Sequence, residues 1–176
     1  MAASLRTVRG NTIVVAEEIG EEHYGFRPTP ESRTVAQTLA HIALSPRIAE
    51  RIHFIEKLHS FEGFDFFKLF GELKAEEQAP RTKAEILDLL RESGEKLAQQ
   101  LESCSEEFLG ERVSSPPRVM PPVVKSRFEM LSSVKEHEMH HRGQLMLVQR
   151  LLGLTPHLTR QMQAMAASMQ AAKAQP

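Results

Sequence analysis

The chain has 176 residues, which suits one domain with a sizeable core, and its formal net charge is −1 at pH 7 with neutral histidines. The near-zero charge, one tyrosine and no tryptophan argue against a nucleic-acid partner. The single cysteine, Cys104, excludes an intramolecular disulfide and fits a reducing compartment. We find no signal sequence and no apolar run of membrane-spanning length, and therefore expect a cytoplasmic protein without a membrane partner.

The first quarter of the chain predicts two amphipathic helices. Apolar residues recur at helical spacing over residues 3–21, and a proline-containing loop follows over residues 23–33. Thr34 then opens a capping box that starts a second helix. This helix carries His41 at the edge of its apolar face. Pro46 lies one turn further on and cannot donate a hydrogen bond, so we expect the helix to kink or restart there.

A phenylalanine-rich stretch follows the second helix. Residues 61–70, FEGFDFFKLF, contain five of the nine phenylalanines. They form either an aromatic wall over a pocket or a satellite apolar cluster beneath a long connection. The sequence predicts no helix here, and it places His53 and His59 on the surface.

The second half of the chain predicts two further helices. A capping box opens a helix over residues 82–103, and another opens a helix over residues 126–152. The connection over residues 104–122 contains four prolines, which forbid a long helix. Residues 159–173 are rich in alanine, glutamine and methionine and form either a short extra helix or a frayed tail.

Four long amphipathic helices without strand-like alternation predict an all-α four-helix bundle. We assign residues 1–158 to the bundle and residues 159–176 to a C-terminal helix or tail. The long connections after the second and third helices argue against a simple up-down-up-down arrangement.

The last long helix carries a histidine pair on its apolar face. His137 and His141 are four residues apart, which places them about 40° apart around the helix and roughly 6 Å apart along it. This spacing allows two imidazoles to converge on one cation. His140 points to a flank and is unsuited to the same ion. The alternative is that the pair consists of core histidines with satisfied hydrogen bonds.

Two stretches of the sequence resemble the DinB-like (DNA-damage-inducible) family of four-helix bundles. One is Leu39-Ala40-His41, and the other is the run HEMHHRGQL over residues 137–145. The resemblance extends from the first helix to about Pro156. It implies a metal site made by His41, His137 and His141, and it implies a homodimer, since bundles of this family are often dimeric.

A site of three histidines leaves at least one coordination position for water or substrate, as in catalytic zinc centres. Imidazole suits Zn²⁺, Ni²⁺, Fe²⁺ or Cu²⁺; we place Zn²⁺ and Ni²⁺ ahead of Fe²⁺. Relatives of this fold include bacillithiol-dependent transferases and mycothiol-dependent isomerases. The resemblance therefore implies a thiol S-transferase with a low-molecular-weight thiol cosubstrate, or a hydrolase, acting on a small electrophilic molecule. The alternative is a non-catalytic, stress-related bundle that binds a metal or a small ligand.

One carboxylate is a candidate helper for this chemistry. Glu138 lies about 60° around the helix from His141 on the inward side, where it would act as general base or as hydrogen-bond acceptor for a metal ligand. The alternative is an ion pair with Arg142, four residues later.

Overall fold

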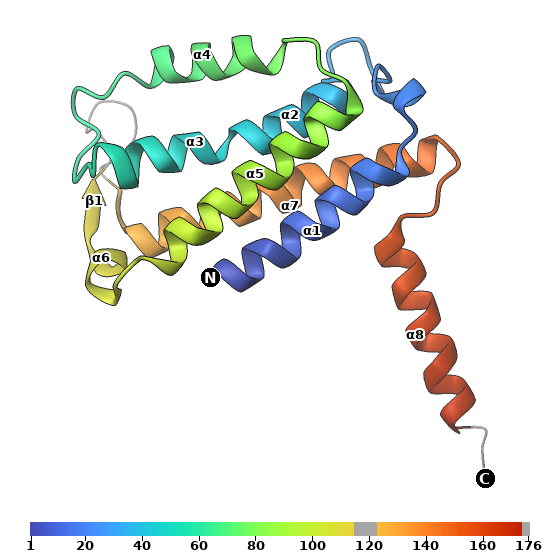
Figure 1. Ribbon diagram of the computed structural model, residues 1–176. Helices are drawn as coiled ribbons and strands as arrows, with labels where there is room; N and C mark the ends of the chain where they lie inside the picture. Colours follow the sequence, from blue (N-terminus) through green and yellow to red (C-terminus); the bar gives the residue numbers. More distant parts are fainter. Residues whose placement is uncertain (115–122, 174–176) are drawn as a thin grey trace.

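The computed structural model describes residues 1–114 and 123–173, and it contains a four-helix bundle with a small hairpin at one end (Figure 1). The fold class expected from the sequence is therefore confirmed. The four bundle helices are α1 (Ala2–Glu18), α2 (Val35–Leu44), α5 (Lys83–Glu102) and α7 (Arg127–Leu151). Further helices and two strands complete the described part: η1 (Glu21–His23), α3 (Pro46–Ala49), η2 (Glu50–Ile55), α4 (Phe66–Glu77), α6 (Glu106–Gly110), α8 (His157–Lys173), β1 (Arg112–Ser114) and β2 (Val124–Ser126).

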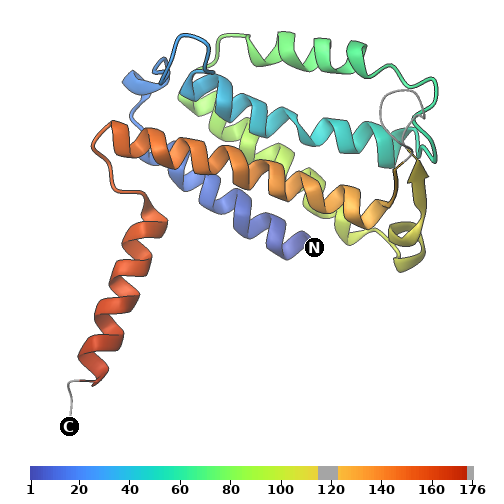
Figure 2. The same ribbon diagram turned by 180° about the vertical axis from the view of Figure 1, so that it is seen from behind.

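The bundle does not alternate up and down. Helix α1 packs against α5 and α7, and α2 packs against the same two helices, so α1 and α2 lie on a diagonal. Helices α1 and α7 run in one direction while α2 and α5 run in the other (Figures 1 and 2). Because α2 and α5 are parallel neighbours, the chain must return along the length of the bundle between them. Helix α4 makes this return and packs against α2.

Local sequence signals fix where three of the bundle helices begin. In each capping box the N-cap hydroxyl accepts a hydrogen bond from the backbone N–H three residues later, and the side chain of that later residue accepts from the N-cap N–H. All three boxes were expected from the sequence, and they are formed by Thr34 with Gln37, Thr82 with Glu85, and Ser126 with Glu129.

Pro46 begins a new helical segment, α3, but the kink that the sequence predicts there is not seen. Ser45 keeps helical dihedral angles (φ −56°, ψ −32°), so α2 and α3 continue as one rod (Figure 1). Pro46 leaves the Ile42 carbonyl without its helical donor. That carbonyl accepts from Ser45 Oγ at 3.2 Å and faces Arg9 Nη2 at 3.5 Å. The rod then ends in the single π-helical turn η2.

Two features of the fold were not expected. Residues 66–77 form helix α4, although the sequence predicted a connection. The helical spacing of Phe66, Leu69, Phe70 and Leu73 after the N-cap residue Asp65 was overlooked, and only Glu77 of this helix is fully buried. Strands β1 and β2 pair antiparallel, with Val113 opposite Lys125, where no strand was expected because each has only three residues. The four prolines of the 104–122 connection lie outside the described residues.

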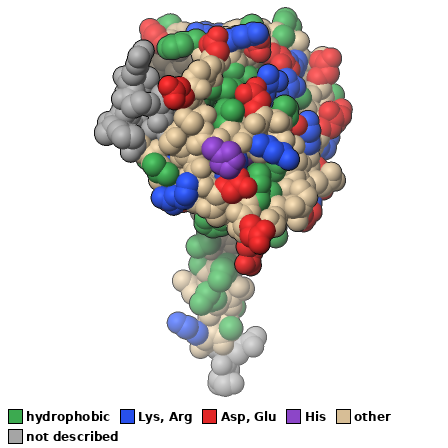
Figure 3. Space-filling view, turned by 90° about the vertical axis from the view of Figure 1, so that its left-hand side faces the viewer, with side chains coloured by type: hydrophobic (Ala, Val, Ile, Leu, Met, Phe, Trp, Pro, Cys, Tyr) green, Lys and Arg blue, Asp and Glu red, His purple; other side chains and the backbone are tan. Residues whose placement is uncertain are grey.

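Helix α8 projects away from the bundle, as Figures 1 and 3 show. Its first residue, His157, is buried and lies 3.2 Å from Asn11 of α1. Its methionines Met162, Met165 and Met169 are exposed. The helix therefore does not pack along the bundle, and contact with a second subunit stays a prediction. None of the described helices is long and apolar enough to cross a membrane.

A buried ion pair divides the core of the bundle. One apolar cluster surrounds Leu5 and Leu131, and another surrounds Val15 and Leu145. Between them, the guanidinium of Arg9 donates from Nε and Nη2 to the two oxygens of Glu138, at 2.9 and 3.0 Å, and the Thr12 hydroxyl donates to the same carboxylate at 2.7 Å.

We predict that Glu138→Ala lowers the free energy of unfolding by about 3–5 kcal/mol, because it leaves the Arg9 charge buried without its partner. Urea unfolding at pH 7 measures the change. The matched control is Glu136→Ala on the exposed face of α7, which should change the free energy by less than about 0.5 kcal/mol. A loss below about 1 kcal/mol for Glu138→Ala would contradict the importance of this ion pair.

Candidate metal centre

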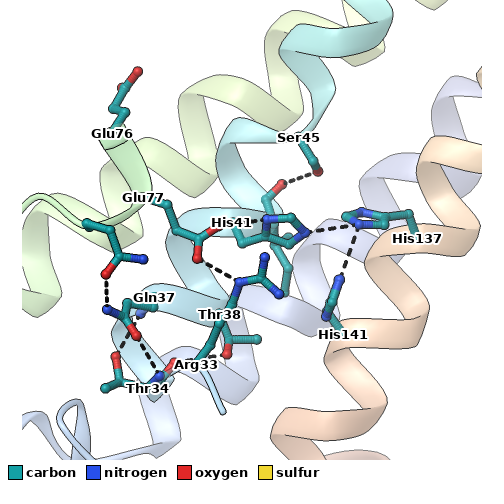
Figure 4. Close-up of polar contacts among 12 residues, drawn as sticks. Arg33, Thr34, Gln37, Thr38, His41, Ser45, Glu76, Glu77, His137 and His141 are labelled. Atoms are coloured by element: carbon teal, nitrogen blue, oxygen red, sulfur yellow. Dashed lines mark hydrogen bonds and ion pairs between the residues drawn. The ribbon is translucent and has the colours of Figure 1, made fainter. Parts of the chain in front are cut away.

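The structure brings the three predicted histidines together between α2 and α7 (Figure 4). His137 Nε2 lies 3.1 Å from His41 Nε2 and 3.2 Å from His141 Nε2. One ligand atom from each of the three rings lies within 4.8 Å of the other two. His41 comes from the last turns of α2, before the Pro46 restart, and the other two lie one turn apart on α7.

The spacing of the ring nitrogens fits a single cation. Tetrahedral zinc with Zn–N bonds of about 2.0–2.1 Å places neighbouring ligand nitrogens roughly 3.3 Å apart. The two shorter Nε2–Nε2 distances, 3.1 and 3.2 Å, are close to this value. The donor set of three imidazoles suits Zn²⁺, Ni²⁺ or Fe²⁺.

Hydrogen bonds at the other ring nitrogen orient two of the ligands. His41 Nδ1 lies 3.0 Å from Glu77 Oε2, and the other oxygen of Glu77 accepts from Arg33 Nε at 2.6 Å. Because a carboxylate accepts only, His41 carries its proton on Nδ1 and leaves the Nε2 lone pair free. Glu77 is 5% exposed, so this bond is shielded from water.

A second chain of hydrogen bonds orients His141. Its Nδ1 lies 2.8 Å from Gln144 Oε1, and Gln144 Nε2 lies 3.2 Å from His140 Nε2. An amide oxygen accepts and an amide nitrogen donates, so His141 is protonated at Nδ1 and also keeps its Nε2 lone pair free. His140, which was expected to point to a flank, is exposed and contacts the cluster through Gln144.

The environment keeps the three imidazoles neutral. Burial, followed by the charges of the neighbouring histidines, lowers the pKa of His137 to about 4. Burial also lowers the pKa of His141, and burial followed by the Arg33 charge lowers the pKa of His41 against the opposing effect of Glu77. Neutral imidazole is the form that binds a metal.

Three hollows open next to the cluster. An apolar cavity of about 510 Å³ is bounded on one side by His41 and His137. A polar groove of about 680 Å³ includes His141 and Gln144. A smaller hollow of about 310 Å³ lies beneath α4 and includes Glu77. The ligand nitrogens are therefore reachable from more than one side.

The phenylalanine-rich stretch fulfils parts of both interpretations. Phe66 packs against Phe61, Phe64 and Phe70, with ring centroids 5.1, 4.7 and 5.7 Å apart, and this is a satellite cluster. Two of its members also bound hollows at the histidines: Phe61 lines the apolar cavity and Phe70 lines the hollow beneath α4.

The structure does not bring Glu138 to the three histidines. Its carboxylate is engaged by Arg9 and Thr12 in the core, and the ion pair considered for Arg142 is formed by Arg9 of α1 instead. The acceptor position that the sequence suggested for Glu138 is held by Glu77. Glu77 was missed because its helix was not expected. The N-cap residue Asp65 and the helical spacing of Phe66, Leu69, Phe70 and Leu73 are the signal that could have located this helix.

The sequence also misplaced one histidine, His53. His59 is exposed as expected, but His53 is 2% exposed and lines the apolar cavity. The reason is the π-helical turn η2, whose i→i+5 winding departs from the 3.6-residue period and buries both Ile52 and His53.

Comparison with known proteins supports the same fold. The sequence model of the DinB family matches residues 1–172. No curated protein matches the chain.

Three solved structures are similar at 17–21% identity. A DinB-like protein of Bacillus subtilis, YjoA, is 21% identical, with a TM-score of 0.63 over 88% of this chain and 92% of its own. YfiT of Bacillus subtilis, described as a probable metal-dependent hydrolase with an unusual four-helix bundle topology, is 18% identical, with a TM-score of 0.65 over 88% and 86%. A DinB-like protein of Bacillus cereus is 17% identical, with a TM-score of 0.62 over 85% and 88%.

We predict that zinc binding at pH 6.5 releases fewer than one proton per chain. The lowered pKa values leave the three ligands already neutral, whereas three histidines with the ordinary pKa of about 6.5 would release about 1.5 protons. Titration calorimetry in buffers of different ionisation enthalpy measures the number. A release of 1.5 protons or more would show that the metal-free cluster is protonated near neutrality.

Proposed function

The chain belongs to the DinB family, and from that premise we propose a metal-dependent enzyme in which His41, His137 and His141 hold one divalent cation, Zn²⁺ or Ni²⁺. The observation that carries this proposal is the convergence of the three Nε2 atoms, with the Nδ1 atoms of two rings fixed by Glu77 and Gln144. The description of YfiT as a probable metal-dependent hydrolase supports the same class of activity.

Three protein ligands leave a position for a reactant, which supports catalysis over a purely structural role. A divalent metal bound there would lower the pKa of a water or thiol and favour its nucleophilic form at neutral pH. The protein supplies the fixed ligand geometry, and the hollows beside the cluster supply room for a small electrophilic substrate.

The polar groove favours a thiol cosubstrate over water alone. Its lining includes the cationic residues Arg27, Arg33 and Lys74 against the carboxylates Glu31 and Glu77, which leaves an excess of one positive charge beside His141. A groove of this size and charge suits a low-molecular-weight thiol that carries carboxylates. We therefore propose thiol transfer as the reaction, with hydrolysis as the second candidate.

We predict that His141→Ala abolishes both metal binding and turnover, because it removes one of three ligands. Glu136→Ala is the matched control, since Glu136 is exposed on the same helix, and it should keep metal and at least half of the activity. Elemental analysis of untagged protein measures the metal. Conjugation of monochlorobimane with bacillithiol or mycothiol, and release of 4-nitrophenol from 4-nitrophenyl acetate without thiol, measure the two reactions. Full activity of His141→Ala would contradict the proposal.

We also predict that Glu77→Gln weakens zinc binding by about 10–100-fold, because the carboxylate that orients His41 and raises its basicity is lost. Glu76→Gln is the control: the neighbouring carboxylate pairs with Arg47 at the surface and lies away from the histidines (Figure 4). Competition with a chromophoric chelator measures both affinities. Equal affinity of the two variants would exclude a role for Glu77 at the metal.

A further inference from the structure

A fourth histidine lies beside the cluster, in the wall of the apolar cavity. His53 belongs to the π-helical turn η2 and is 2% exposed. The same cavity, of about 510 Å³, reaches His41 and His137. Apart from these rings its walls are mostly apolar; they include the buried residues Ala49, Ile52 and Val113 and the half-buried residues Ile48, Phe61 and Val134. Its charged members, Lys125 and Glu129, are exposed.

The hydrogen bond from Arg127 fixes the tautomer of the His53 ring. Arg127 Nη1 lies 3.1 Å from His53 Nδ1, and a guanidinium has donors only, so Nδ1 accepts this bond. The proton of the neutral ring is therefore on Nε2. Burial, with the Arg127 charge as a second cause, lowers the pKa of His53 to about 4, so the ring is neutral at physiological pH.

The charge behind His53 is already balanced. Arg127 is fully buried, its Nε donates to Glu111 at 2.8 Å, and its Nη2 donates to the Lys57 carbonyl at 3.1 Å. The cavity therefore faces a neutral imidazole backed by a compensated ion pair. A carboxylate entering it would lose its hydration without meeting a free charge.

His53 Nε2 has no hydrogen-bond partner among residues 1–114 and 123–173. With Nδ1 turned to Arg127, the ring presents its opposite edge to the cavity. This nitrogen is not among the described buried side-chain atoms that lack a partner, so it keeps some accessible surface, and a ligand acceptor in the cavity can reach it. The π-helical turn that places it there is of a kind found frequently at functional sites.

The geometry points to the apolar cavity as a subsite for an uncharged, mainly apolar substrate group that carries a hydrogen-bond acceptor such as a carbonyl or ether oxygen. His53 is the specificity-determining residue and donates from Nε2 to that acceptor. The assignment rests on the proposed function only in taking the three-histidine cluster as the reacting centre.

The test uses two probes of nearly equal shape, acetophenone and α-methylstyrene, which differ in a carbonyl oxygen against a CH₂ group. Binding is measured by calorimetry or ligand-observed NMR on the full chain, both as purified and with a chelator. Long-range ¹H–¹⁵N spectra of histidine-labelled protein report the state of His53 Nε2. The variants are His53→Asn, whose amide oxygen keeps an acceptor for Arg127 but loses the Nε2 donor, and His53→Gln, whose amide reaches the Nε2 position.

We expect the ketone to bind roughly two- to tenfold more tightly than the alkene, the range given by one hydrogen bond. Only the ketone should change the ¹⁵N chemical shift of His53 Nε2. The preference should disappear in His53→Asn and return in His53→Gln. Equal affinities for wild type, no binding of either probe, or a preference that survives His53→Asn would each overturn the assignment.

If the His53→Asn variant does not fold, the affinities of the wild-type protein for the two probes and the chemical shift of His53 Nε2 still test the subsite. The outcome is independent of the metal, since the preference is also measured with chelator present. If the wild-type protein binds metal and shows turnover but does not prefer the ketone over the alkene, only the proposed subsite is refuted. A retained preference in a protein without metal or turnover would refute the enzyme alone.

Discussion

The buried ion pair between Arg9 and Glu138 sets the rotation of α7 about its own axis. Glu138 lies about 80° around the helix from the mean direction of His137 and His141. Helix α7 packs against both α1 and α2, which are diagonal to each other, so the directions to these neighbours differ by roughly a right angle. When Glu138 reaches Arg9 on α1, the two histidines therefore face His41 on α2. Glu138, which the sequence suggested as a helper at the cluster, therefore fixes the orientation of the helix that carries two of the three histidines.

Helix α4 and the histidine cluster stabilise each other through the hydrogen bonds of one residue, Glu77. Glu77 is the single buried residue of this helix, and its two oxygens bond His41 and Arg33. A helix with so little apolar burial gains little stability from packing. The contacts of Glu77 therefore hold one end of the crossover connection against α2, and the same contacts fix the tautomer of His41.

The elements with strong local signals were predictable from the sequence. Capping boxes and apolar periodicity located α2, α5 and α7, and the spacing of His137 and His141, with the family resemblance, identified the histidines that the fold assembles. What could not be predicted depends on tertiary structure. Glu77 lies 36 residues beyond its partner His41, at the C-terminal end of a helix whose apolar residues are only half-buried or exposed, so its contact with His41 depends on how the two helices pack. His53 is buried by a π-helical turn, which a 3.6-residue period cannot reveal.

The two sides of the cluster differ in a way that separates two kinds of ligand. The groove at His141 is polar with an excess of one positive charge, whereas the cavity at His41 and His137 is mainly apolar and is lined by the neutral donor His53. An anionic molecule gains from the groove and loses from the cavity, and the reverse holds for an uncharged apolar one. Because the two hollows adjoin different histidines of one cluster, the arrangement would suit the proposed reaction between two dissimilar molecules at one cation. Simple hydrolysis of a single substrate would have no need of a second hollow of this size.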